Sequence, residues 1–348
     1  MSVHSRAIGM MFLLALIFAE VLHATTWDEP WQREIIADSD AIVRVKITKS
    51  EPDRVEFSVL KQISGEKVPK TGALVGFSKL KLRSFSVKED VFGFRNESEY
   101  YLFLEATDNS GEYRIATPTA GYAPTRDGRT MATYRHSYHQ AYVPDAHYEM
   151  SMQAIFGTLK ERKPDLSKAR DYIAREVAKK PADIPEEIDS EEFRRFCSQH
   201  VSLEMLYYLG GANAARLEPF LKHKNPHGQI SAVRALGRLP KAESEPRLLE
   251  FIKEKDRNSF AKVMAVWALR DMGAKGAAVE LTRILRTTED QKSGFGGNLM
   301  DPRVGTHFPE SVHQAISEIL TAWNGSIESG TGQPTTAPEL KAEAKRKP

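Results

Sequence analysis

Two hexapeptides in the second half of the chain are near copies of each other: AVRALG at positions 232–237 and AVWALR at positions 265–270. The same shift of 33 positions relates LLEFI at 248–252 to LTRIL at 281–285. A repeat of this length is typical of two short antiparallel helices that bury their apolar faces only when neighbouring pairs stack. The chain is therefore predicted to contain an α-solenoid.

Weaker copies of the same pattern lie on both sides of this pair, at 203–221 and at 315–323. The dipeptides Leu-Pro at 239–240 and Met-Gly at 272–273 are suited to ending a helix, so they predict the turns between helices. The solenoid is predicted to span residues 189–324.

In its alanine-rich wording, repeat spacing and turn positions, this region resembles HEAT repeats of the short bacterial type related to phycobilisome-lyase repeats. The resemblance implies an architecture with an extended, rigid face that suits a protein or peptide partner. It implies no catalytic residue and no cofactor, and chromophore-lyase activity does not follow from it.

The first half of the chain carries the pattern of β-strands. Apolar and charged residues alternate along 41–47 and again along 54–63, and Pro-Asp at 52–53 predicts a turn that joins the two strands in a hairpin. Further strands are expected at 73–77, 100–105, 112–117 and 129–143. Several short strands almost without helix predict a small closed or nearly closed barrel, which together with a terminal helix spans 25–162.

The stretches AIVRVKI at 41–47 and EYYLFL at 99–104, the strand from Val55 and a final helix near 152–160 make this half similar to bacterial extracytoplasmic modules with an OB-like, tissue-inhibitor-like barrel. Protease inhibition is not implied, because the disulfide frame of the animal inhibitors is absent. Cys197 is the single cysteine, and we expect it to be buried. The predicted fold is α+β with two domains, an OB-like β-barrel followed by a solenoid of HEAT-like helix pairs.

The two ends of the chain differ from its interior. Arg6, the apolar run at 7–18 and Leu-His-Ala at 22–24 predict a signal peptide over 1–24, with a retained anchor as the alternative. The run is shorter than the roughly 20 residues of a membrane span, so none is expected after cleavage. A helix and linker are predicted for 163–188, and the Gly, Ser, Thr, Pro and Lys-rich segment 325–348 predicts a disordered tail.

Composition excludes some classes of partner. The chain of 348 residues is 41% hydrophobic and has 49 basic against 47 acidic residues, a net charge of +2. Such a balance is that of a soluble globular protein, and it provides no long-range field for nucleic acid. We expect a protein or peptide partner in the cell envelope, and a periplasmic or secreted location.

Three histidines form the best candidate metal cluster: His136, His139 and His147. If 129–143 is one strand, His136 and His139 point to opposite faces, so a shared ion requires a loop or bulge. A metal-dependent envelope hydrolase, with these histidines and the loop at Gly294 near one cleft, is the alternative function.

Two pairs of residues are candidates for contact with a partner. Arg234 and Arg238 lie one helical turn apart in a basic segment, which predicts either a ridge for an acidic partner or an ordinary charged solvent face. Tyr134 and Tyr138 share one face of the expected strand 129–143. Their rings either bind a partner or cover the barrel core.

A polar insertion, 287–310, separates the third copy of the repeat from the fourth. It contains Phe295 and Asn298 in a glycine-rich stretch, and long connections of this kind are often functional. The alternatives are a ligand-contacting loop and a tolerated, partly disordered insertion. The chain as a whole is predicted to be a non-enzymatic exported binding or scaffold protein that recognises a protein or peptide partner through its repeat surface.

Overall fold

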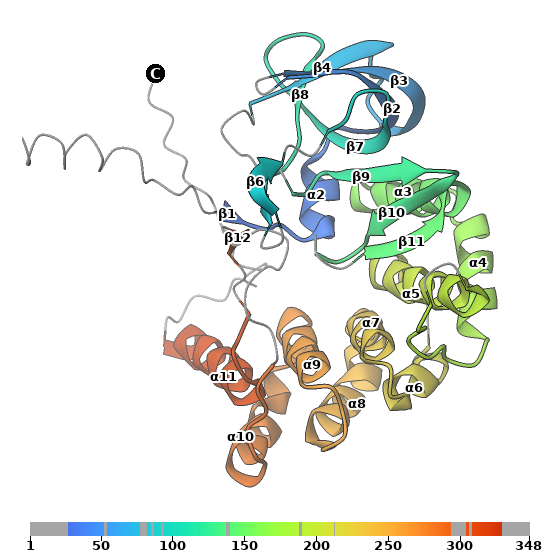
Figure 1. Cartoon of the computed structure of the whole chain (residues 1–348). Helices are drawn as coiled ribbons and strands as arrows, with labels where there is room; N and C mark the ends of the chain where they lie inside the picture. The colour runs from blue at the N-terminus through green and yellow to red at the C-terminus, as the bar shows by residue number, and fades with distance from the viewer. Residues whose placement is uncertain are drawn as a thin grey trace, which may run out of the picture.

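A β-barrel with additional strands is followed by a run of helices in the computed structural model (Figure 1). The predicted α+β fold and the HEAT-like helical region are confirmed. The structure describes residues 27–51, 54–76, 82–84, 87–91, 94–117, 119–136, 140–187, 190–211, 213–293, 304–305 and 308–328. The predicted signal peptide lies outside this part of the chain.

The strands are β1 (Trp27–Asp28), β2 (Ala41–Ser50), β3 (Arg54–Gly65), β4 (Thr71–Val75), β5 (Leu82–Ser84), β6 (Val87–Val91), β7 (Glu99–Ala106), β8 (Glu112–Arg114), β9 (Tyr122–Arg126), β10 (Arg129–Thr133), β11 (Gln140–Pro144) and β12 (Val304–Gly305). The helices are α2 (Gln32–Asp38), α3 (Asp145–Leu159), α4 (Ser167–Val177), α5 (Glu191–Leu209), α6 (Ala214–Lys222), α7 (Pro226–Leu236), α8 (Lys241–Lys253), α9 (Ser259–Asp271), η1 (Lys275–Ala277), α10 (Ala278–Thr287) and α11 (Val312–Glu328).

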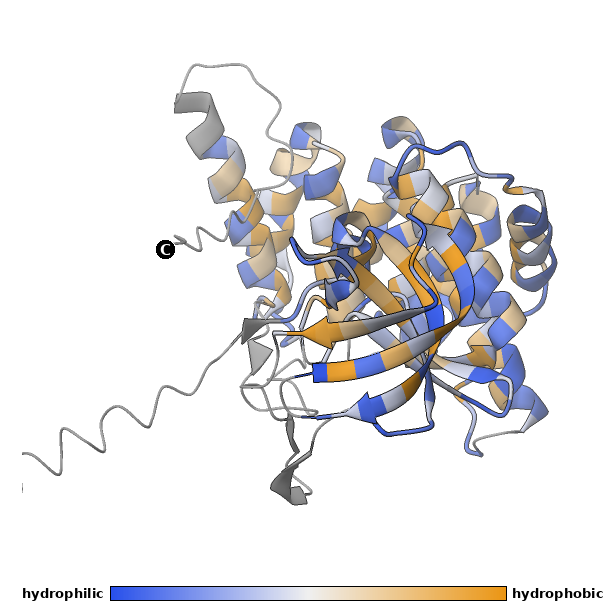
Figure 2. Ribbon diagram, turned by 90° about the horizontal axis from the view of Figure 1, so that it is seen from above, coloured by the Kyte–Doolittle hydropathy of each residue, from blue (hydrophilic) through white to orange (hydrophobic). Residues whose placement is uncertain are grey.

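Five strands close the barrel in the order β2–β3–β4–β8–β7, because β7 pairs with both β8 and β2. The parallel pair β4–β8 within an otherwise antiparallel barrel is the strand arrangement of an OB-fold. Figure 2 shows hydrophobic and hydrophilic residues alternating along the strands, and Val43, Val45 and Ile47 are fully buried. Burial of such side chains stabilises the fold by about 1.5–3 kcal/mol each.

An additional sheet continues from β7 through β9 and β10 to β11. The expectation of a single strand over 129–143 is wrong: β10 and β11 are two antiparallel strands of a hairpin. Helix α3 follows β11 directly and packs on β10 and β11. Its first turn is fixed by Asp145, whose Oδ1 accepts hydrogen bonds from the hydroxyls of Thr125 and Thr130, each at 2.7 Å.

The helices form two layers (Figure 1). The inner layer, toward the barrel, consists of α5, α7, α9 and α11, each packed on the next, and α6, α8 and α10 form the outer layer. Close approach of α7 and α9 depends on small residues, because a Cβ added at Gly237 would lie 2.8 Å from the Cβ of Ala268. Helix α11 continues to Glu328, so the first residues of the predicted tail, 325–328, are helical.

Asparagine side chains start three of these helices: Asn213 for α6, Asn225 for α7 and Asn258 for α9. Each side-chain oxygen accepts a hydrogen bond from a backbone N–H of the first turn, which satisfies a donor that has no partner within the helix. Asn225 and Asn258 are separated by the same 33 positions as the repeated hexapeptides.

Barrel and helices share a buried core. One apolar cluster runs from Ile42 of β2 through α3 and α5 to Trp323 of α11, and a second cluster fills the barrel. Residues 179–187 lie in the segment 163–188 that was predicted as a helix and linker, and they are tied to the repeats. Gln199 Oε1 accepts a hydrogen bond from the N–H of Ala182, and Asn225 Nδ2 donates to the carbonyl of the same residue. Among the described residues, no helix combines the length and hydropathy needed to cross a membrane.

Candidate functional site at the junction of barrel and repeats

A column of three side chains follows the inner helices on the side that faces the barrel. Tyr207 of α5, Arg234 of α7 and Trp267 of α9 make up this inner-face column, and Arg234 and Trp267 hold equivalent places in the 33-residue repeat. The guanidinium carbon of Arg234 lies 4.2 Å from the centroid of the Tyr207 ring. The column is thus a basic and aromatic strip on the face that a solenoid uses for binding.

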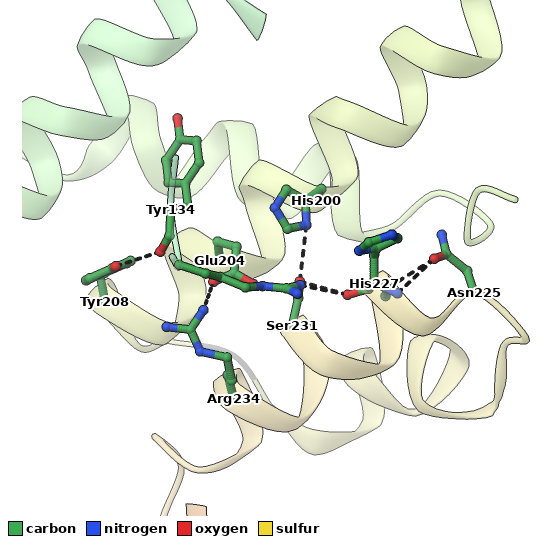
Figure 3. Close-up of polar contacts among 10 residues, drawn as sticks. Tyr134, His200, Glu204, Tyr208, Asn225, His227, Ser231 and Arg234 are labelled. Carbon is green, nitrogen blue, oxygen red and sulfur yellow. Dashed lines mark hydrogen bonds and ion pairs between the residues drawn. The ribbon is translucent and has the colours of Figure 1, made fainter. Parts of the chain in front are cut away.

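An ion network joins Arg234 of this column to the connection between β10 and β11 (Figure 3). Glu204 of α5 is fully buried and pairs with Arg234 and with Arg135, which lies between β10 and β11. Arg135 also donates to the hydroxyl of Ser231 and, at 2.9 Å, to the carbonyl of His227. A second link is the 2.7 Å hydrogen bond from the Tyr208 hydroxyl to the carbonyl of Tyr134. These contacts join the connection between β10 and β11 to two neighbouring inner helices, α5 and α7.

The charges in this network are mutually dependent. Burial alone would raise the pKa of Glu204, but the guanidinium groups of Arg135 and Arg234 outweigh it and lower the pKa to about 2. A buried pair of this kind is strongly destabilised when one partner is removed, because the other charge then lacks compensation.

Two neutral histidines lie beside the network. Burial, reinforced by Arg135, lowers the pKa of His200 well below its ordinary value and that of His227 to about 4. Ser231 Oγ is 3.3 Å from His200 Nδ1. The small cavity lined by these rings and by Phe196 has a volume of about 10 Å³. That is room for a single water molecule, so it does not accommodate an organic substrate.

Trp31, in the connection between β1 and α2, packs on the inner-face column. Its ring centroid lies 6.3 Å from that of Trp267, 5.9 Å from that of Phe308 and 5.8 Å from that of His136, in each case edge to face. The guanidinium carbon of Arg234 is 5.2 Å from the same ring. Edge-to-face pairs and a cation near an indole are favourable arrangements. Three aromatic rings and one cation therefore surround this indole.

Glu29 holds the same segment from its other side. The carboxylate is buried and accepts hydrogen bonds from the hydroxyls of Thr117, at 2.8 Å, and of Thr119. The backbone carbonyl of Glu29 lies 3.1 Å from His136 Nε2. Burial lowers the pKa of His136 to about 4, so the ring is neutral at pH 7.

The insertion 287–310 meets this N-terminal segment. Its two ends are joined by a bridge between Lys292 and Ser311 and by a 2.8 Å hydrogen bond from the N–H of Ser293 to the carbonyl of Glu310. Strand β12 within it pairs in parallel with β1, and Phe308 stacks on Trp267 at 5.6 Å between centroids. Phe295 and Asn298 of the predicted contact loop lie outside the described residues.

Among the other candidate contact residues, Arg234 is the one whose described position differs from the prediction. Arg234 does not lie on an exposed ridge, because its side chain is buried in the ion pair with Glu204. Arg238 is exposed, with its guanidinium carbon 5.8 Å from the centroid of Tyr207. Tyr134 is fully buried and its hydroxyl contacts Ser151, as the core interpretation predicts, while Tyr138 lies outside the described residues.

The candidate metal histidines that the structure describes have different surroundings. His136 packs on Trp31, whereas His147 of α3 packs on Tyr172 at 4.7 Å between centroids. His139 and Gly294 lie outside the described part, within which no three His, Cys, Asp or Glu side chains are placed to hold an ion. The expectation that Cys197 is buried is confirmed, and burial raises the pKa of its thiol.

Sequence reasoning missed the residues that build the junction: Arg135, Glu204, Ser231 and Trp31. One signal was available. Glu204 interrupts the apolar run VSLEMLYYL at 201–209, and Arg234 interrupts AVRALG in the same way. Charged residues among buried neighbours are almost always paired, so the two could have been predicted as partners.

Comparison with known proteins identifies the helical region. Residues 214–292 match the family model described as HEAT repeats. This match covers the helices from α6 to α10 and part of the insertion. No curated protein and no solved structure matches the chain.

Proposed function

We propose that this protein is an exported, non-enzymatic scaffold that recognises a protein or peptide partner in the cell envelope through its HEAT-repeat surface. The observation that carries the proposal is the HEAT-repeat match over 214–292, together with the continuous inner layer of helices. HEAT repeats present extended surfaces that commonly bind proteins.

Arg238 is the side chain of the inner surface that we assign to first contact. It is exposed at the end of α7, stacks toward Tyr207 and follows the buried Arg234 by one turn. An exposed guanidinium above an aromatic ring suits a carboxylate on the partner, because arginine binds carboxylates through a planar pair of donors. The partner is therefore a protein with an acidic surface segment.

Charge reversal tests this assignment. The variant Arg238→Glu is compared with Arg216→Glu on the outer helix α6, where the arginine is also exposed. Each tagged protein is used to capture partners from an envelope fraction, and the captured protein is then purified and titrated. We expect Arg238→Glu to weaken binding at least about tenfold, or 1.4 kcal/mol, and Arg216→Glu to leave it unchanged. Equal binding by both variants contradicts the assignment.

Export has its own test. N-terminal sequencing of the protein purified from an envelope fraction is expected to begin at Thr25, directly after the predicted signal peptide. A chain that starts at Met1 or Ser2 and remains in the cytoplasmic fraction contradicts export.

A further inference from the structure

The inner-face column is occupied by the chain's own N-terminal segment. Trp31 and Glu29 are held in separate places: the indole among Trp267, Phe308 and His136, and the carboxylate on Thr117 and Thr119. Trp267 belongs to the helical repeat, whereas the other partners of the two side chains lie outside it, in the β-domain and the insertion. The segment therefore behaves like a bound peptide, with two side chains that act as anchors.

The backbone of this segment has the form of an extended ligand. Proline at position 30 restricts φ, and Trp31 has φ −71° and ψ 150°, which is extended. Strand β1 lies just before it and adds to β12 in parallel, the pairing by which an extended peptide adds to an existing strand. Residues 27–31 read WDEPW, so two carboxylates and two indoles fall within five positions.

A cation also lies against this segment. The guanidinium carbon of Arg234 is 5.2 Å from the centroid of the Trp31 ring, a favourable arrangement for a cation and an indole. We propose that the inner-face column, together with the hydroxyls of Thr117 and Thr119, is a binding site for an extended peptide in which a glutamate precedes a tryptophan by two residues. The chain's own residues 27–31 occupy this site in cis.

This inference rests on the proposed function and names the class of partner that it recognises. A partner with the Glu-x-Trp spacing enters by displacing Trp31, because the same rings cannot hold two indoles. A tethered segment competes at an effective concentration in the millimolar range, so the free site binds such a peptide more tightly than the wild-type chain does. Competition from the cis segment then sets the concentration of partner that is needed for binding.

The test uses a labelled peptide of sequence WDEPWQRE, which copies residues 27–34, with WDEPAQRE and WDQPWQRE as matched controls. The receptor is the full chain with Glu29→Ala and Trp31→Ala, which removes both anchors of the cis segment. Fluorescence anisotropy is expected to show binding at least about tenfold tighter than to wild type. Each control peptide is expected to bind at least tenfold more weakly, and adding Trp267→Ala is expected to abolish binding.

Absence of binding to a folded double variant overturns the inference, and so does equal binding of WDEPWQRE and WDEPAQRE. If the double variant does not fold, wild-type protein labelled with 5-fluorotryptophan provides the measurement. Excess WDEPWQRE is expected to move the Trp31 fluorine resonance to a solvent-exposed position, and an unchanged resonance at millimolar peptide overturns the inference. A captured partner whose binding is unaffected by loss of the anchors refutes the peptide site alone. Peptide binding without any captured partner refutes the proposed function alone.

Discussion

The barrel core and the ion network of the junction are both buried, but they are built from opposite chemistry. The barrel is filled by apolar residues such as Val45 and Leu102, which are 0% exposed. The junction contains Glu204, also 0% exposed, between two guanidinium groups. Apolar burial is non-directional and stabilises any compact arrangement of about the right shape. The ion network pairs all its charges in only one arrangement of the chain. It therefore specifies how the connection between β10 and β11 packs on the repeats.

Removal of Glu204 is expected to have the largest effect on stability, because this residue is the buried carboxylate of the ion network. Glu204→Leu keeps an apolar side chain in the space but leaves Arg135 and Arg234 buried without their carboxylate. The expected loss is about 3–5 kcal/mol in the free energy of unfolding, measured by urea denaturation.

A triple variant separates charge from packing at the same place. Glu204→Leu combined with Arg135→Met and Arg234→Met removes all three charges, and it is expected to be more stable than Glu204→Leu alone. A loss below about 1 kcal/mol for Glu204→Leu would show that water reaches the network and that the junction is not held by charge.

A substitution in the apolar core of the barrel provides the comparison with Glu204. Leu102→Ala in β7 removes a fully buried side chain and leaves a cavity, with an expected loss of about 3 kcal/mol in unfolding free energy. This loss should be independent of pH between 5 and 8, because the barrel cluster contains no histidine among its described members. Urea denaturation at both pH values checks the expectation, and a pH-dependent loss contradicts it.

The spacing of apolar residues along the sequence predicted most of the fold. Alternation at 41–47 predicted β2, and the shift of 33 residues predicted the helix pairs, because both depend only on which face of a local element is buried. The same reasoning failed at 129–143. Alternation continues through both β10 and β11, so no local signal marks the turn between them.

The junction could not be predicted because its contacts are remote in sequence. Arg135 and Glu204 are 69 positions apart, and Glu29 and Thr119 are 90 positions apart. Neither pair belongs to a periodic element that would fix their relative position. Arg234 was predicted to be exposed because arginine is mostly a surface residue, and its burial becomes understandable only once Glu204 is seen beside it.

A fall in pH should destabilise the junction more than the barrel, by a smaller free energy than the substitutions above. The pKa of His227 in the folded protein is about 4, and that of His200 is also lowered, so the unfolded chain binds more protons between pH 6.5 and pH 4. The stability from these neutral rings is therefore complete above pH 6.5 and is lost as the pH falls toward 4. Glu204, with a pKa of about 2, loses its contribution only below about pH 4.5.

Protonation of His227 is expected to remove about 2 kcal/mol of stability between pH 6.5 and pH 5, and His200 acts in the same direction. Hydrogen exchange followed by mass spectrometry checks the location: amides of α5 and α7 should lose protection in this range before those of β2 and β7. His227→Asn should flatten the pH dependence of the free energy of unfolding. Loss of protection in the barrel first would place the acid-sensitive point outside the junction.

The helix caps provide the smallest and most closely matched comparison, because Asn225 and Asn258 occupy equivalent places in adjacent repeats. Asn258→Ala removes one hydrogen bond to the first turn of α9 and is expected to lower the free energy of unfolding by about 1 kcal/mol. Asn225 caps α7 in the same way, but its Nδ2 also donates to the buried carbonyl of Ala182 at 2.9 Å. Asn225→Ala should therefore lose about 2 kcal/mol. Asn→Asp should recover the cap at both positions, and at position 225 it should leave the Ala182 carbonyl without its donor. Equal losses for the two alanine variants would mean that the contact with Ala182 adds nothing, and that residues 179–187 are not held to the repeats by Asn225.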